Sequence, residues 1–68
     1  MDTHVYKIVQ ITGTSTKGSD DAVRVAIEKA GQSVRNLRWF RITDTRGEIE
    51  NGKVAYWQVS IELGFTLE

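Results

Sequence analysis

Three segments of the chain alternate apolar and polar side chains with the period of a β-strand. They cover residues 4–12, 37–46 and 55–65, and they are rich in the β-branched and aromatic residues that favour strands. Asn51 and Gly52 lie between the second and third segments, and both residues tolerate the positive φ of a type I′ turn. We therefore expect the second and third segments to form an antiparallel hairpin.

A fourth segment, residues 20–33, carries apolar residues at helical spacing. Its apolar stripe consists of Ala22, Val23, Ala26, Ile27, Ala30 and Val34. Ser19 is expected to be the N-cap, and Asp20 and Asp21 fall in the first turn, where the helix dipole favours negative charge. Residues 13–18 (GTSTKG) have the composition of a loop. The pattern therefore predicts one amphipathic helix after the first strand.

The order of these elements predicts an α+β fold with β-α-β-β topology. A right-handed crossover makes the first and second strands parallel to each other. The third strand has the cleanest apolar face and is expected between them, which gives a three-stranded antiparallel sheet of order 1-3-2 wrapped on one helix. At 68 residues the chain has room for a single domain, residues 1–68.

One helix covers only one face of such a sheet. The residues expected against the helix are Phe40, Ile42, Ala55, Trp57, Val59, Ile61, Leu63 and Phe65. The opposite face is expected to carry Trp39, Arg41, Thr43, Tyr56, Gln58, Ser60 and Glu62. Exposed aromatic surface on a small chain marks an interface or a ligand site, and the outer strands leave unpaired edges. We therefore expect the protein to self-associate.

Composition excludes several classes of function. Nine Lys and Arg balance nine Asp and Glu, so the chain lacks the basic surface that nucleic acid or an anionic membrane selects. It has no cysteine for disulfides or thiolate metal ligands, and one histidine. No apolar run approaches the roughly 20 residues of a membrane span, and the N-terminus does not begin a signal peptide. We expect a soluble, cytoplasmic protein.

Enzymatic signatures are weak along the whole chain. His4 is the one imidazole, and no cysteine is available for it to activate. The segment Gly13–Gly18 has the spacing of a phosphate-binding loop but lacks the Lys-Ser/Thr that should follow the second glycine. A turn followed by a helix cap is the preferred interpretation of that segment. We expect a protein that is not an enzyme.

Trp39 and Gln58 are the pair with the clearest binding chemistry. Both are expected on the uncovered face, on neighbouring strands. An aromatic plane beside an amide suits a flat heteroaromatic ligand with a hydrogen-bonding edge. Arg46, further along the strand of Trp39, is suited to a phosphate or carboxylate. The pattern alone leaves a second interpretation open, in which Trp39 fills a subunit interface and Gln58 satisfies backbone groups there.

At these residues the chain resembles the dodecins over nearly its whole length. The segments that carry the resemblance are Val5-Tyr6-Lys7, Gly13-Thr14-Ser15, Asp21-Ala22-Val23, Leu37-Arg38-Trp39-Phe40, Arg46-Gly47, Asn51-Gly52-Lys53-Val54, Tyr56, Gln58-Val59, Gly64-Phe65 and Leu67-Glu68. Each segment is weak alone, but their order and spacing in a 68-residue chain are specific.

The resemblance implies a hollow dodecamer of cubic-type symmetry that binds flavins in pairs. The family's tryptophan, matching Trp39, stacks on the isoalloxazine ring, and two such residues sandwich a flavin dimer. The glutamine that matches Gln58 hydrogen-bonds the pyrimidine edge of the ring. Asp44 matches an acidic position that touches the ligand in archaeal members. Arg46 matches an arginine near the flavin side chain in bacterial members, where it would favour the phosphate of FMN.

The implied role is flavin storage and protection without turnover, with stacking between the indoles quenching the excited flavin. FMN is favoured, riboflavin is the other flavin considered, and some bacterial members also hold coenzyme A. Thr66 departs from the bacterial pattern, which commonly has arginine there, and this weakens the case for phosphate contacts. The alternative is a structural or adaptor homo-oligomer without a flavin. A small flavin-dependent enzyme is disfavoured, because a ring stacked on both sides leaves little room for a substrate.

Overall fold

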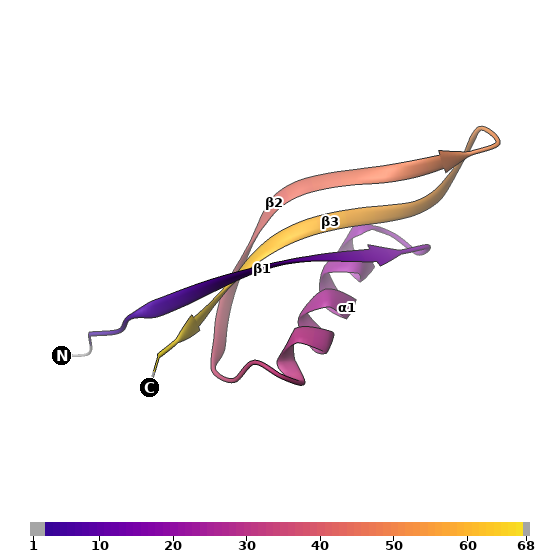
Figure 1. Ribbon diagram of the computed structural model, residues 1–68. Coiled ribbons are helices and arrows are strands. Elements are labelled where there is room, and N and C mark those ends of the chain that lie inside the picture. The colour runs from indigo at the N-terminus through magenta and orange to yellow at the C-terminus, as the bar shows by residue number, and fades with distance from the viewer. Residues whose placement is uncertain (1–2, 68) are drawn as a thin grey trace.

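The computed structural model describes residues 3–67 of the chain. Its elements are β1 (Tyr6–Ser15), α1 (Ser19–Gly31), β2 (Leu37–Glu50) and β3 (Lys53–Thr66). β3 lies between β1 and β2 and pairs antiparallel with both, so the strand order is 1-3-2. α1 lies against one face of this sheet (Figure 1). The predicted α+β fold and strand order are confirmed.

The core lies where α1 crosses the middle strand. Val59, Ile61 and Leu63 of β3 are buried, because alternate residues of a strand point to the same face and this face meets the helix. Ala22 and Ala26 of α1 complete the buried cluster. Small side chains on the helix allow it to approach the sheet closely. The prediction that these three β3 residues face the helix is confirmed.

β1 is longer at its C-terminal end than its composition indicates. It continues through Ser15, so the loop predicted over residues 13–18 is wrong for its first three residues. Gly13 is the reason that the helix fits there, because a Cβ at this position would lie 2.6 Å from the Ala22 carbonyl oxygen and 2.8 Å from the Ala26 Cβ. The glycine marks a close approach of helix to strand rather than a turn.

The start of α1 is tied to the end of β1 by side chains. The prediction that Ser19 is the N-cap is wrong: Gly18 occupies that position, and the helix ends at Gly31 rather than Ser33. Ser15 Oγ donates to Asp21 Oδ2 at 2.7 Å and accepts from the Lys17 amide at 2.9 Å. The Ser15 hydrogen bond lowers the pKa of Asp21 from 3.8, with help from the positive charge of Arg24 and against the effect of burial.

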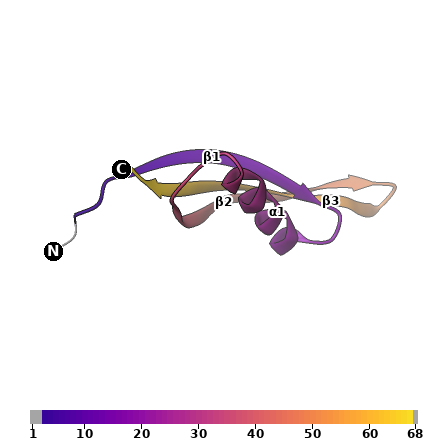
Figure 2. The same cartoon turned by 90° about the horizontal axis from the view of Figure 1, so that it is seen from below.

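The hairpin of β2 and β3 extends beyond the helix. Asn51 and Gly52 have φ of 54° and 74°, as expected for the predicted turn. β2 ends at Glu50, four residues later than the pattern predicts, and β3 begins at Lys53, two residues earlier. The tip of the hairpin therefore projects past the end of β1 (Figures 1 and 2). α1 packs mainly on β1 and β3 and, apart from Leu37 at its start, leaves most of β2 uncovered. Phe40 and Ile42, predicted to pack on the helix, are therefore 49% exposed.

Candidate functional site

The sheet face opposite α1 carries all four candidate residues. We call it the open face, and along β3 it consists of Tyr56, Gln58, Ser60, Glu62, Gly64 and Thr66. The residues paired with them on β1 and β2 share this face. It has an aromatic end beside Tyr6 and a polar middle. Beyond Tyr56 the pairing shifts by one residue, so the apolar side chains of Ile49 and Val54 at the hairpin tip lie on the helix side of the sheet.

Trp39 lies at the aromatic end, on a platform made by a glycine. Gly64 is its partner on β3, and a Cβ at Gly64 would overlap the indole ring. The Tyr6 ring of β1 meets the indole edge-on, with 6.2 Å between ring centroids. Trp39 remains 38% exposed although it packs against both residues. The indole is therefore positioned by the sheet and still offers aromatic surface for stacking.

Asp44 and Arg46 reach the open face because β2 contains a bulge. Simple alternation from Trp39 would put them on the helix side. The pairing shifts between Ile42 and Asp44, and the extra residue, Thr43, donates its hydroxyl to the Ser60 carbonyl at 3.1 Å. Beyond the bulge, Asp44 pairs with Ser60, and Arg46 pairs with Gln58. The bulge thus gathers a carboxylate, a guanidinium and an amide in the polar middle.

The polar middle is preorganised by ion pairs. Arg46 Nε donates to Asp44 Oδ2 at 2.8 Å, which leaves its terminal nitrogens to donate to another anion. Arg41 donates to Glu62 Oε1 at 2.7 Å, between this group and Trp39. Both pairs are exposed, so they orient side chains more than they stabilise the fold.

Trp39 and Gln58 are not brought together within one chain. Their β3 positions, Gly64 and Gln58, are six residues apart, which is about 20 Å along a strand. This length exceeds that of a three-ring heteroaromatic. The sequence pattern places the two residues on one face of neighbouring strands but does not give this separation.

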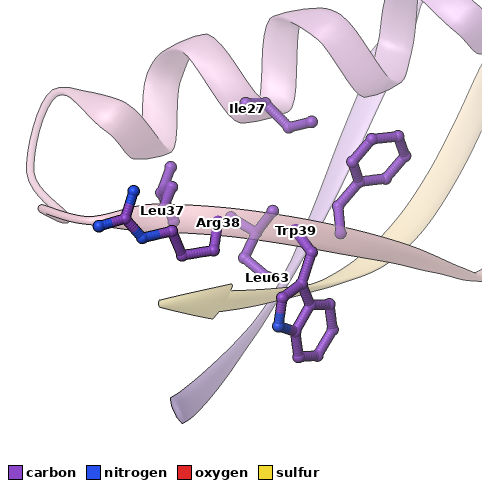
Figure 3. A pocket seen from close by; sticks show the side chains of 6 residues that line it. Ile27, Leu37, Arg38, Trp39 and Leu63 are labelled. Carbon is purple, nitrogen blue, oxygen red and sulfur yellow. The ribbon is translucent and has the colours of Figure 1, made fainter. Parts of the chain in front are cut away.

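A cavity of about 150 Å³ lies on the other side of β2. It is lined by Ile27, Leu37, Arg38, Trp39, Phe40 and Leu63. Figure 3 shows Ile27 above the strand and the Trp39 ring below it, directed away from the helix. Trp39 therefore contributes to the edge of the cavity, while its indole belongs to the open face.

Thr66, the departure from the bacterial pattern, lies on the open face opposite Tyr6. It is 5% exposed, and its amide donates to the Asn36 carbonyl at 3.2 Å. Within residues 3–67 its hydroxyl has no hydrogen-bond partner. The end of the sheet beside Trp39 therefore holds a small neutral side chain at this point.

The dodecin family profile matches residues 5–68. The chain belongs to the dodecin family. It is 41% identical to the dodecin of Thermus thermophilus over 64 residues, covering 94% of this chain and 93% of that protein. The solved Streptomyces coelicolor dodecin superposes with a TM-score of 0.93 at 50% identity, covering 100% of this chain and 97% of the other.

A more distant relative carries a metal in its name. The calcium dodecin of Mycobacterium tuberculosis is 30% identical over 64 residues, covering 93% of this chain and 89% of that protein. Among residues 3–67 here, no group of three or more His, Cys, Asp and Glu side chains is placed to hold a metal ion. Over the same residues no helix has the length and apolarity to cross a membrane.

Dodecin family membership supports a small oligomeric flavin-binding protein of a non-enzymatic family. Within residues 3–67 of the isolated chain, ten large apolar side chains are at least 38% exposed. They include Val5, Ile8, Ile49 and Leu67 as well as those at the candidate site. Such a surface is expected of a subunit that buries it against other copies.

Proposed function

We propose that this protein stores and protects flavins, binding them in pairs between the Trp39 side chains of two subunits in a hollow homododecamer. FMN is the preferred flavin and riboflavin the other candidate. The observation that carries the proposal is the exposed Trp39 ring held on Gly64, on the same face as Gln58 and Arg46. Family membership supplies the ligand class.

The separation along β3 supports a site shared between copies. A flavin stacked on Trp39 lies beside Gly64, and the Gly64 and Gln58 positions are about 20 Å apart along β3, so in this proposal a second chain supplies the amide. Gln58 then offers one acceptor and two donors to the pyrimidine edge of the ring. Arg46 donates to the FMN phosphate, and Asp44 holds its guanidinium in place.

Storage without turnover follows from such an arrangement. A flavin with an indole on one face and a second flavin on the other has no exposed face for a substrate. The tryptophan is also an electron donor in contact with the ring, and electron transfer from it quenches the excited flavin. In the same proposal the protein acts in the cytoplasm. Coenzyme A as an additional ligand stays a prediction from the sequence.

The structural or adaptor homo-oligomer is the second candidate. It is favoured by the edge-on contact of Trp39 with Tyr6, because aromatic residues clustered on an open face are also typical of subunit interfaces. In this candidate the indole packs against another subunit and no flavin binds.

A titration of Trp39 variants separates the two. Purified protein is titrated into FMN and, separately, into riboflavin while flavin fluorescence and the mass of the assembly are recorded. We expect quenching by the native chain, and by the control Trp57→Phe, whose ring lies on the helix side. Trp39→Ala should lose roughly 5- to 150-fold in affinity, as for loss of one stacked ring, with the assembly intact. Dissociation of Trp39→Ala without flavin binding by the native chain would favour the structural oligomer.

A further inference from the structure

The tip of the β2–β3 hairpin is an apolar surface without cover. Beyond the pairing of Ser15 with Trp57, β1 has ended and the sheet has two strands. Ile49 and Val54 are directly paired there and are 73% and 54% exposed. A two-stranded ribbon with solvent on both faces is marginally stable. Exposed apolar surface of this kind is typical of a site that packs against a partner.

A matching apolar cavity exists elsewhere on the same subunit. The cavity of about 150 Å³ between α1 and β2 opens beside the uncovered Phe40. An apolar cavity of about this volume holds a benzene-sized group in other proteins, so it has room for a branched aliphatic side chain. Its walls are the apolar side chains of Ile27, Leu37 and Leu63.

The charges around the two surfaces are opposite. Glu48 and Glu50 flank the tip, and with Lys53 they leave it net negative. Arg38, the second residue of β2, lines the cavity, and Arg35 lies in the loop that precedes this strand. Within residues 3–67 none of the two glutamates and two arginines forms an ion pair. Both surfaces thus carry charges that remain available to each other.

The tip cannot reach the cavity of its own subunit. Val54 and Leu63 are nine residues apart on β3, about 30 Å along an extended strand. The occupant has to be the tip of another copy. Such a contact joins two different surfaces, and contacts of this type generate closed rings when the rotation closes.

We propose that the hairpin tip of each subunit docks into the α1–β2 cavity of the next copy, with Ile49 and Val54 as its apolar anchors and Glu48 and Glu50 facing Arg35 and Arg38. This interface lies apart from the open-face ligand site and does not depend on flavin binding. It leaves the Trp39 indole on the opposite side of β2 free for its ligand.

Cross-linking tests which surface receives the tip. The chain has no native cysteine, so the double variant Val54→Cys/Phe40→Cys carries two thiols that one chain cannot join. Treated with a short bismaleimide, it should give a covalent ladder beyond dimers. The matched variants Val54→Cys/Lys29→Cys and Val54→Cys/Ile8→Cys should give none. The proposal would be overturned if a control variant gave the ladder and the Phe40 variant did not, or if no variant gave a ladder.

Charge reversal gives a second test that leaves the cavity walls intact. Glu48→Arg/Glu50→Arg and Arg35→Glu/Arg38→Glu should each raise the protein concentration at which the assembly dissociates by about tenfold or more. The chain with all four changes should return close to the native value. If the fourfold variant dissociates more readily than both parents, the two surfaces do not meet.

Discussion

The Gly64→Ala substitution tests whether the sheet itself positions the candidate ligand-binding ring. The added methyl would overlap the Cε2, Cζ2 and Nε1 atoms of Trp39. Keeping the indole in place against that overlap would cost about 1–3 kcal/mol, so the ring should leave its platform. The strand itself should tolerate the change, because alanine is the better residue in a strand interior by roughly 0.5–1 kcal/mol.

The readout is flavin affinity, measured by fluorescence quenching. Loss of a well-placed stacking partner is worth about 1–3 kcal/mol, so Gly64→Ala should weaken FMN binding roughly 5- to 150-fold. Gly31→Ala is the matched control, because its added Cβ would meet Leu37 Cδ1 at an ordinary 4.0 Å. In a Trp39→Ala background Gly64→Ala should have no further effect. Native affinity of Gly64→Ala would refute the platform argument.

Three further predictions concern stability. The pKa of Asp21 is lowered in the fold, so the ionised carboxylate stabilises the protein above pH 3.8, and this stabilisation is lost as the pH falls through the folded pKa. Asp21→Asn and Ser15→Ala should therefore reduce the dependence of the unfolding midpoint on pH in the acid range. Gly13→Ala should destabilise the protein by about 1–3 kcal/mol in chemical denaturation, through its clash with Ala22, and a native midpoint would contradict the close packing. Ile61→Ala, at a fully buried position, should cost about 2–5 kcal/mol by the same measurement.

The sequence pattern predicts the architecture well because each element is locally consistent. The Asn51-Gly52 turn and the alternation in β3 fix the hairpin and the face that meets the helix. Element ends are less well predicted. Gly13 resembles a loop residue in composition, yet its role is to let α1 approach β1, and such long-range packing is invisible in a local window.

The candidate site shows the same division. Trp39 and Gln58 can be assigned to the open face by alternation, but Asp44 and Arg46 reach it through the bulge at Thr43, which alternation does not reveal. Alternation does not predict that the Trp39 ring packs over Gly64. A glycine inside a strand is nevertheless a signal of close approach, and Gly64 carried that signal. The distance between Trp39 and Gln58 depends on the register of β2 against β3, and alternation predicts the face of each residue but not this register.

Size-exclusion chromatography with light scattering, after addition of FMN or riboflavin, tests the central claim most directly. The account predicts one species near twelve times the 7.7-kDa mass of the chain, with flavin absorbance across the peak and quenched flavin fluorescence. The flavin that is better retained identifies the preferred ligand. A monomeric mass, or a large assembly that elutes without flavin, would contradict the proposed function.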